Sequence, residues 1–216
     1  MTKTKAFSIV EKAEFNQYWY SCKTIETLVD ELLHLQQRLK PDGPLRVACL
    51  STPSVFFTVT AAPELSEKLE CWLFDFDPHL LQGERCVKFD YREPKDVPAN
   101  LCHTFECVLI DPPFITKEVW ENYAITAKLL AASGCHFIGS SVRENSELLQ
   151  GLLGMTAVPF QPSIPNLVYQ YDFFTNYSPE GPFEHAGHRM SRWCWKGRNA
   201  GYGYDPVHGL KIDQIK

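Results

Sequence analysis

Four consecutive residues, Asp111-Pro112-Pro113-Phe114, carry the clearest chemistry in the sequence. They follow the apolar run 105–110, which predicts a buried β-strand. The two prolines fix the backbone and supply no N–H donors, so the loop should be stiff. The Asp111 carboxylate and the Pro112 carbonyl could each accept one N–H of a substrate amine. Phe114 could stack on a planar base or line the path of a lysine side chain. The loop would then aim a nitrogen at an electrophilic methyl group, with positioning and water exclusion supplying most of the catalysis.

Acidic residues also follow two earlier apolar runs. Asp75 and Asp77 come after the run 71–74, and Asp90 comes after the run 86–89. In open α/β sheets, ligands bind beyond the carboxyl ends of the strands, and an acid about 20 residues past the first strand can bind a ribose. A single Asp at such a place would usually be a loop or helix-capping residue, and an ordinary strand-to-helix turn is the alternative for 111–114. Three converging acids favour an adenosine-type cofactor.

The turn after the first apolar run has no glycine. It reads Ser51-Thr52-Pro53-Ser54, and neither G-x-G-x-x-G nor G-x-x-x-x-G-K-[ST] occurs in the chain. Binding of NAD, FAD or a nucleoside triphosphate therefore loses its main support. S-adenosylmethionine, which has a ribose and no phosphates, fits better.

Three stretches with different patterns would position these residues. In residues 1–44, the aromatic group Tyr18-Trp19-Tyr20 precedes a helix with Ser21 or Thr24 as N-cap, and these rings could simply be a packing plug. Residues 45–177 alternate strand-like runs with helical segments, which predicts an α/β core with a parallel sheet. The expected strands are 45–50, 71–74, 86–89, 105–110, 136–140, 155–160 and 168–175, and the expected helices include about 116–131 and 144–153.

Composition limits the class of protein. The 216 residues are 44% apolar with a net charge of −5, which argues against binding nucleic acid mainly through counterion release. No apolar run reaches the ~18–20 residues of a membrane span, and the first residues lack a secretory signal, so we expect a soluble cytoplasmic protein. Four of the eight cysteines, at 49, 71, 107 and 135, lie in apolar runs, and none has zinc-site spacing. We expect reduced core thiols and no metal.

Residues 178–216 form a third stretch with a different character. They contain six Lys or Arg against four Asp or Glu, half of the glycines, and the aromatic residues Trp193 and Trp195. The stretch could be a basic aromatic strip that binds RNA or an acidic protein surface. It could equally be an extension wrapped over the sheet or a disordered tail. His185, His188 and Cys194 provide only three potential zinc ligands.

Taken together, the motifs resemble the N6-adenine-methyltransferase-like family, and most closely its members that methylate a lysine of translation elongation factor 1-alpha. The resemblance extends from about residue 14 to residue 177 and rests on the order and spacing of five segments: 17–21, 48–54, 74–77, 89–91 and 111–114. It implies a seven-stranded, Rossmann-like, S-adenosylmethionine-dependent methyltransferase sheet with helices on both faces and an antiparallel last strand.

The resemblance also implies roles for individual residues. The cofactor would be covered by Tyr18, Trp19, Tyr20 and Ser21, with Ser51, Thr52, Pro53 and Ser54 in place of the glycine-rich loop. Either Asp75 or Asp77 would bind the ribose, Asp90 and Tyr91 would lie beside the adenine, and Asp111, Pro112, Pro113 and Phe114 would receive the target amine.

The identity of the acceptor stays open at this point. A protein lysine is favoured, because an acidic enzyme suits a basic substrate such as elongation factor 1-alpha. Adenine N6 of RNA or DNA is the alternative, and a catalytically silent methyltransferase-like subunit is a third possibility that the presence of Asp111 disfavours.

Overall fold

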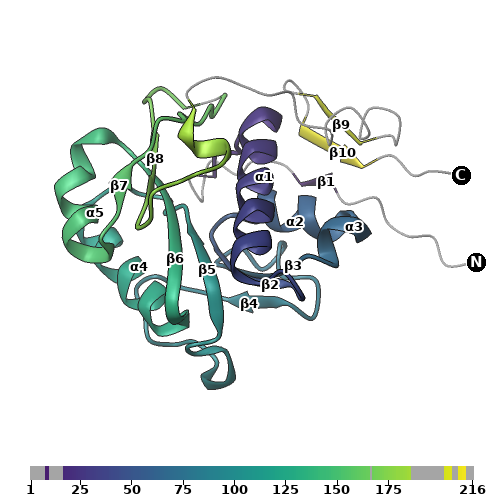
Figure 1. Ribbon diagram of the computed structural model, residues 1–216, viewed down its shortest axis with the longest axis horizontal. Helices are drawn as coiled ribbons and strands as arrows, with labels where there is room; N and C mark the ends of the chain where they lie inside the picture. The colour runs from purple at the N-terminus through teal and green to yellow at the C-terminus, as the bar shows by residue number, and fades with distance from the viewer. Residues whose placement is uncertain (1–7, 10–16, 166, 186–201, 206–208, 213–216) are drawn as a thin grey trace, which may run out of the picture.

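A seven-stranded mixed sheet forms the centre of the protein (Figure 1). The computed structural model describes residues 8–9, 17–165, 167–185, 202–205 and 209–212. The strand order is β4-β3-β2-β5-β6-β8-β7; the first five are parallel, and β8 is antiparallel to both β6 and β7. This confirms the expected fold class. The strands are β2 (Leu45–Leu50), β3 (Leu69–Asp75), β4 (Cys86–Lys88), β5 (Phe105–Ile110), β6 (Ala131–Ser141), β7 (Thr156–Ala157) and β8 (Asp172–Thr175).

Helices cover both faces of the sheet (Figure 1). The alternating side chains of β2 show the division: Val47 and Cys49 pack in one apolar cluster, and Ala48 and Leu50 in another. The first cluster includes α1 (Cys22–Leu39), α2 (Pro53–Ala61) and α3 (Pro63–Ser66), and the second includes α4 (Lys117–Leu130) and α5 (Ser146–Leu153). A strand buried on both faces reads as a continuous apolar run, which is why these strands were predictable.

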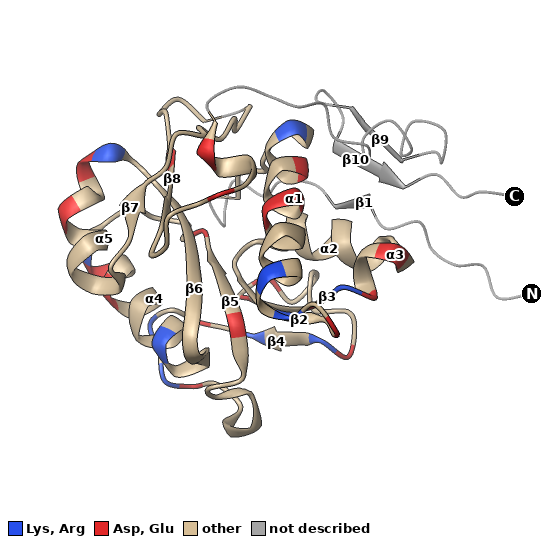
Figure 2. Ribbon diagram, in the orientation of Figure 1, with Lys and Arg blue, Asp and Glu red and all other residues tan. Residues whose placement is uncertain are grey.

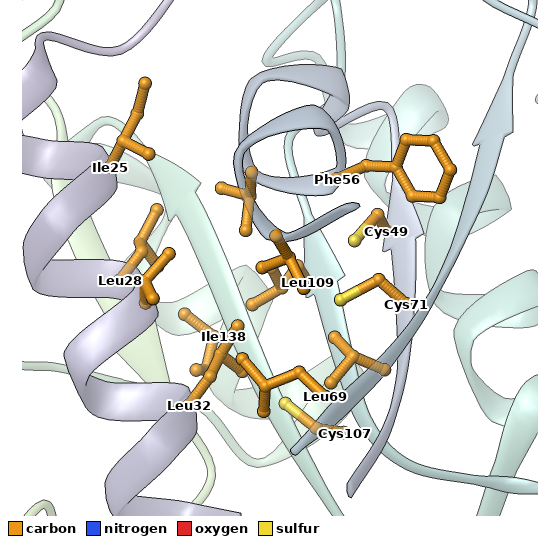
Figure 3. Close-up of a cluster of buried hydrophobic side chains, with 14 of the residues drawn as sticks. Ile25, Leu28, Leu32, Cys49, Phe56, Leu69, Cys71, Cys107, Leu109 and Ile138 are labelled. Carbon is orange, nitrogen blue, oxygen red and sulfur yellow. The ribbon is translucent and has the colours of Figure 1, made fainter. Parts of the chain in front are cut away.

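Cysteine thiols form part of the core beneath α1 (Figure 3). Cys49, Cys71 and Cys107 lie among leucines of α1, β3 and β5, and all three are fully buried. Burial raises the pKa of the Cys107 thiol well above its ordinary value, and a hydrogen bond with Cys49 together with burial does the same for Cys71. Every described cysteine is free, and the four that we expected in the core are buried. They act as small apolar residues.

The helix α1 begins and ends where the sequence indicates. The Ser21 hydroxyl accepts a hydrogen bond from the backbone N–H of Thr24 at 3.3 Å, so Ser21 is the N-cap. Ile25, Leu28 and Leu32 follow at helical spacing and are buried against the sheet. The helix ends at Leu39, two residues before Pro41.

Several boundaries differ from those expected. The strands predicted at 155–160 and 168–175 are reduced to β7 and β8. Pro159 cannot donate to a sheet ladder, which limits β7, and residues 168–171 belong to the loop before β8. Strand β3 is longer than 71–74 and reaches Asp75, β6 begins already at residue 131, and β4 ends one residue early. The sequence did not predict α2, whose residues are mainly β-branched or aromatic.

The remaining elements are short. They are the 3-10 helices η2 (Ala99–Leu101), η3 (Arg143–Asn145) and η4 (Pro182–Glu184), and a separate antiparallel sheet of β1 (Ser8–Ile9), β10 (Gly209–Ile212) and β9 (Tyr202–Asp205). The predicted strip around Trp193 and Trp195, with His188 and Cys194, lies outside the described residues.

The described residues also show how charge, hydropathy and potential metal ligands are distributed. Blue and red segments are interspersed over the described ribbon, with no basic stripe in that part (Figure 2). Among the described helices, none combines the length and apolar composition of a membrane span. The residues that the structure describes contain no group of three His, Cys, Asp or Glu arranged to hold a metal ion.

Candidate active site

A pocket of about 270 Å³ opens at the carboxyl ends of the parallel strands. It lies where the chain order reverses, since β2 has β3 on one side and β5 on the other. The pocket is lined by 14 of the 16 predicted site residues: Tyr18, Trp19, Ser51, Thr52, Pro53, Ser54, Asp75, Asp77, Asp90, Tyr91, Asp111, Pro112, Pro113 and Phe114.

The two other predicted residues do not line the pocket. Ser21 caps α1 and donates its backbone N–H to the Ser163 carbonyl at 2.8 Å. Tyr20 is 2% exposed, and its ring packs edge-on against Phe173 at 5.7 Å. Both residues lie behind the pocket wall that Tyr18 and Trp19 form.

Eight further residues line the pocket that the sequence had not assigned to the site. Four are neighbours of predicted residues and could have been found by extending the motifs: Gln17, Phe76, Phe89 and Arg92. Tyr123 lies on α4, and the other three, Ile164, Leu167 and Tyr171, belong to the loop before β8. The last four residues have no local sequence signal.

The turn after β2 brings unusual groups to the pocket. Ser51 has φ 54°, a left-handed conformation that favours glycine, so a serine takes the glycine-like backbone at this turn. Its hydroxyl shares a 2.7 Å hydrogen bond with the hydroxyl of Tyr123. Thr52 is 3% exposed, and its buried Oγ1 has no hydrogen-bond partner among the described residues. A buried hydroxyl without a partner is costly unless a ligand supplies one.

The carboxylates of Asp75 and Asp77 have different hydrogen-bond partners. Asp77 Oδ1 accepts hydrogen bonds from the backbone N–H and the ring of His79 at 3.0 and 2.9 Å, and Oδ2 accepts one from Gln17 at 3.4 Å. Asp77 therefore holds the turn that follows β3. Asp75 accepts the Asp77 N–H on Oδ1 at 2.9 Å. Burial raises the pKa of Asp75 to about 6, and the charge of Asp77 adds to the rise.

Asp90 is held by an arginine at the edge of the pocket. Arg92 binds both of its carboxylate oxygens, with the shortest distance 2.6 Å from Nη2 to Oδ2. This ion pair lowers the pKa of Asp90. The Arg92 guanidinium also lies 5.7 Å from the centre of the Phe76 ring, and Phe76 is 42% exposed in the pocket. Phe76 thus presents an aromatic surface to a planar ligand.

The Asp111-Pro112-Pro113-Phe114 loop is not a helix cap. Helix α4 begins at Lys117, and the Thr116 hydroxyl accepts the Val119 N–H, so Thr116 is the N-cap. Asp111 instead follows β5 directly, where its N–H donates to the Leu50 carbonyl at 3.1 Å. Phe114 is 48% exposed at the pocket wall. The alternative that these residues only start a helix is therefore wrong.

Asp111 lines the pocket, and no cationic side chain of the described residues is paired with it. One oxygen, Oδ1, accepts the hydroxyl of Ser140, which in turn accepts the hydroxyl of Tyr20 at 2.8 Å. The carboxylate faces the pocket with part of its surface, but protein surrounds the rest. This burial raises the pKa of Asp111 to about 7, and the hydroxyl groups of Ser140 and Tyr20 oppose the rise. The group is thus poised near neutral pH.

Hydrogen bonds connect the start of α1 to the loop before β8, and residues next to both segments line the pocket. The Thr24 hydroxyl and the backbone of Ser163 exchange two hydrogen bonds, at 3.2 and 2.8 Å. This joins the start of α1, which follows Tyr18 and Trp19, to the loop that carries Tyr171. Burial and the negative charge of Asp111 raise the pKa of Tyr171 to about 12, so it presents a neutral phenol near the acid.

The residues present fit S-adenosylmethionine. Asp75 offers a carboxylate at the place of a ribose, Phe76 and Tyr91 offer aromatic surfaces, and the unpartnered hydroxyl of Thr52 needs a polar partner. A cofactor without phosphates also suits a turn that contains no glycine.

Comparison with known proteins agrees with this geometry. Residues 11–179 match the model of the family described as probable N6-adenine methyltransferase, and the chain belongs to this family. It is a methyltransferase with the Rossmann-like fold and uses S-adenosylmethionine.

Similar proteins include curated relatives and a solved structure. The chain is 28% identical over 172 residues to EEF1A lysine methyltransferase 1 of Homo sapiens, covering 78% of this chain and 76% of the relative. It is 30% identical over 166 residues to the protein of the same name from Danio rerio, covering 75% and 96%. A branched-chain polyamine synthase mutein from Thermus thermophilus, solved with N4-aminopropylspermidine and 5'-methylthioadenosine, shares the fold with a TM-score of 0.54 and 16% identity, covering 78% and 59%.

Proposed function

We propose that this protein transfers a methyl group from S-adenosylmethionine to the ε-amino group of a lysine in a protein substrate. The observation that carries the proposal is the environment of Asp111: a carboxylate lining the pocket that, among the described residues, is held by hydroxyl groups and not by a cation. Such a carboxylate keeps its charge available for an incoming ammonium group.

The aromatic residues around Asp111 suit a lysine side chain. Tyr18, Phe114 and Tyr171 line the same pocket as the acid, and Tyr18 and Phe114 are 38% and 48% exposed. Aromatic rings can pack against the alkyl part of lysine, and their faces attract its cationic end. The carboxylate then guides the amino group to the reacting position, and the Pro112 carbonyl accepts a second N–H.

The raised pKa of Asp111 reduces the cost of deprotonating the lysine. A lysine has an ordinary pKa near 10.4, so proton transfer to a carboxylate of pKa 3.8 would cost about 9 kcal/mol, whereas transfer to one of pKa about 7 costs about 5 kcal/mol. Asp111 accepts the proton directly or through water. S-adenosylmethionine supplies an electrophilic methyl group: the nitrogen lone pair forms the new N–C bond as the C–S bond breaks, and its electron pair stays on sulfur.

At the other end of the pocket, we assign the ribose to Asp75. The side chains of Gln17 and His79 bind the two oxygens of Asp77, whereas the hydrogen bonds to Asp75 come from the backbone N–H groups of Phe76 and Asp77. Strand β3 also extends to Asp75, so this carboxylate lies at the strand end itself. Phe76, Asp90 and Tyr91 would then surround the adenine.

Elongation factor 1-alpha is the protein substrate that we propose, because the curated relatives from Homo sapiens and Danio rerio are named for lysine methylation of EEF1A. We also propose that the protein is cytoplasmic, as expected from its sequence. Adenine N6 stays the alternative acceptor, because the half-exposed ring of Phe114 could equally stack on a flipped base.

A single transfer experiment separates these acceptors. The protein is incubated with methyl-labelled S-adenosylmethionine and either purified elongation factor 1-alpha or total RNA, and the labelled residue is identified by mass spectrometry. We expect label on a lysine and none on RNA. Label on adenine alone would overturn the lysine proposal, and binding of the cofactor without any transfer would favour a silent subunit.

Asp111→Asn provides the test of mechanism in the same assay. We expect transfer to fall by at least about a hundredfold, the range of acid–base catalysis, while cofactor binding persists. Asp96→Asn is the matched control, because Asp96 is exposed and outside the pocket. Equal activity of the two variants would contradict the role of Asp111.

A further inference from the structure

A chain of hydrogen bonds runs from the acceptor group to the segment that precedes α1. Asp111 Oδ1 accepts from Ser140 Oγ, and Ser140 Oγ accepts from the Tyr20 hydroxyl at 2.8 Å. The three residues come from the end of β5, from β6 and from residues before α1, so sequence separations of 29 and 120 residues are bridged. Asp111 lines the pocket, whereas Ser140 and Tyr20 do not.

The direction of these bonds fixes the state of each hydroxyl. A serine hydroxyl has one proton, and Ser140 can give it to Asp111 while its lone pair receives the Tyr20 proton. Ser140 and Tyr20 are 1% and 2% exposed, so water cannot easily replace either of them. The two hydroxyls therefore hold the carboxylate from the buried side and leave its other side to the acceptor.

The groups packed around Asp111 supply hydroxyls and no positive charge among the described residues. Tyr20 comes from the segment before α1, Ser140 from β6, Tyr123 from α4 and Tyr171 from the loop before β8. The pKa values of Tyr20, Tyr123 and Tyr171 are all raised by burial and by the charge of Asp111, and Asp75 acts on Tyr123 as well. Neutral hydroxyl groups therefore stabilise and orient the Asp111 carboxylate, as the guanidinium of Arg92 does for Asp90.

From this geometry we propose that Ser140 is a positioning residue that fixes the orientation of the Asp111 carboxylate, and that Tyr20 in turn orients Ser140. The inference rests on the proposed amine methylation. It also means that Tyr20 links the acceptor group to Tyr18 and Trp19, which line the pocket immediately before it in the chain. The position of residues 18–20 and the orientation of the Asp111 carboxylate therefore depend on each other.

The chain offers a matched pair of serines for the test. Ser140 and Ser141 are adjacent on β6 and equally buried, but the Ser141 hydroxyl accepts from Trp120 Nε1 at 3.2 Å and from Asn145 Nδ2 at 3.0 Å. Ser140→Ala and Ser141→Ala remove the same atom from the two sides of one strand. Ser140→Thr keeps the hydroxyl, and Tyr20→Phe removes only the outer member of the chain.

We expect Ser140→Ala to lower kcat about ten- to hundredfold, the effect of losing a hydrogen bond to a charged group, with little change in the KM of the cofactor. The acidic limb of its pH–rate profile should move to higher pH, because the carboxylate loses a donor that stabilises its charge. Ser140→Thr should restore most of kcat, and Tyr20→Phe should show a smaller change in the same direction. Ser141→Ala should lower Tm and leave the profile in place.

A direct titration separates this proposal from the proposed function. The Asp111 carboxyl carbon is followed by NMR in carbon-13 aspartate-labelled full-length protein without acceptor, and its signal is assigned by its loss in Asp111→Asn. The proposal expects a higher pKa in Ser140→Ala and Tyr20→Phe than in wild type and Ser141→Ala. An unchanged Asp111 titration and wild-type kcat in both variants would overturn it. If the wild-type protein transferred no methyl group, the proposed function would be wrong, but the titration would still test the role of Ser140. If Ser140→Ala does not fold, the Asp111 titration in Tyr20→Phe decides the question.

Discussion

Asp90 and Asp111 occupy comparable places in the fold, each just beyond the end of a parallel strand and each lining the same pocket. Their environments are opposite. Asp90 lies near the edge strand β4 with Arg92 on both of its oxygens, and its pKa is lowered. Asp111 follows β5 in the middle of the sheet, its partners among the described residues are hydroxyls and not a cation, and its pKa is raised to about 7.

The difference shows that the position of an aspartate in the sheet sets its pKa and the role for which it is suited. At the edge, solvent and the exposed Arg92 neutralise the acid, which agrees with the place beside an adenine that we propose for it. At the centre, burial penalises the charge, and the acid becomes a group that can bind a cation or accept a proton near neutral pH. Comparable strand-end acids therefore suit different tasks.

The largest expected effect is the pH dependence that Asp111 imposes. Its pKa is raised, so the charged form is present above about pH 7 and is lost as the pH falls through that value. Measured from pH 8 to pH 5, kcat/KM for the protein substrate should fall by about a hundredfold, with an inflection near 7. A rate that stays constant between pH 5 and 8 would show that Asp111 and Asp90 do not differ as the structure indicates.

A smaller effect is expected for Asp75, whose pKa of about 6 lies between those of Asp90 and Asp111. Asp75→Asn keeps an oxygen for the Asp77 N–H but removes the charge, so the Kd of S-adenosylmethionine should rise about ten- to hundredfold by calorimetry. Asp77→Asn is the control: it should mainly destabilise the turn at His79 and change the Kd less. If the Asp77 variant binds the cofactor more weakly than the Asp75 variant, the ribose assignment is wrong.

The smallest effect concerns the edge pair. Arg92→Ala removes an ion pair whose arginine side chain is 65% exposed, so the urea midpoint of unfolding should hardly change. Urea unfolding measures this change, with Lys95→Ala as a surface control, since Lys95 is an exposed neighbour outside the pocket. A clear drop of the urea midpoint relative to Lys95→Ala would mean that the pair is structural and not merely a surface contact.

Much of the fold and of the site was predictable because it depends on local pattern. Strands buried on both faces are continuous apolar runs, so 45–50 and 105–110 were predicted with their observed bounds. The acids at 75, 90 and 111 follow such runs, and parallel strands bring their carboxyl ends to one edge. Pro159 limited the strand predicted at 155–160, the strand predicted at 168–175 begins only at Asp172, and segment 53–61 is a helix in spite of its β-branched residues.

The sequence by itself predicted the acids at the strand ends, the stiff Pro-Pro loop and a cofactor without phosphates, since each depends on residue types within a few positions of one another. It left the N-cap of the first helix open between Ser21 and Thr24, and the structure decided for Ser21. Only the tertiary structure decided that Asp75 and Asp77 have different partners, that Tyr171 joins the pocket, and that Tyr20 reaches Asp111 through Ser140. These features depend on which distant segments pack together. Burial and hydrogen-bond partners, which set the pKa of a carboxylate, exist only once the sheet has assembled.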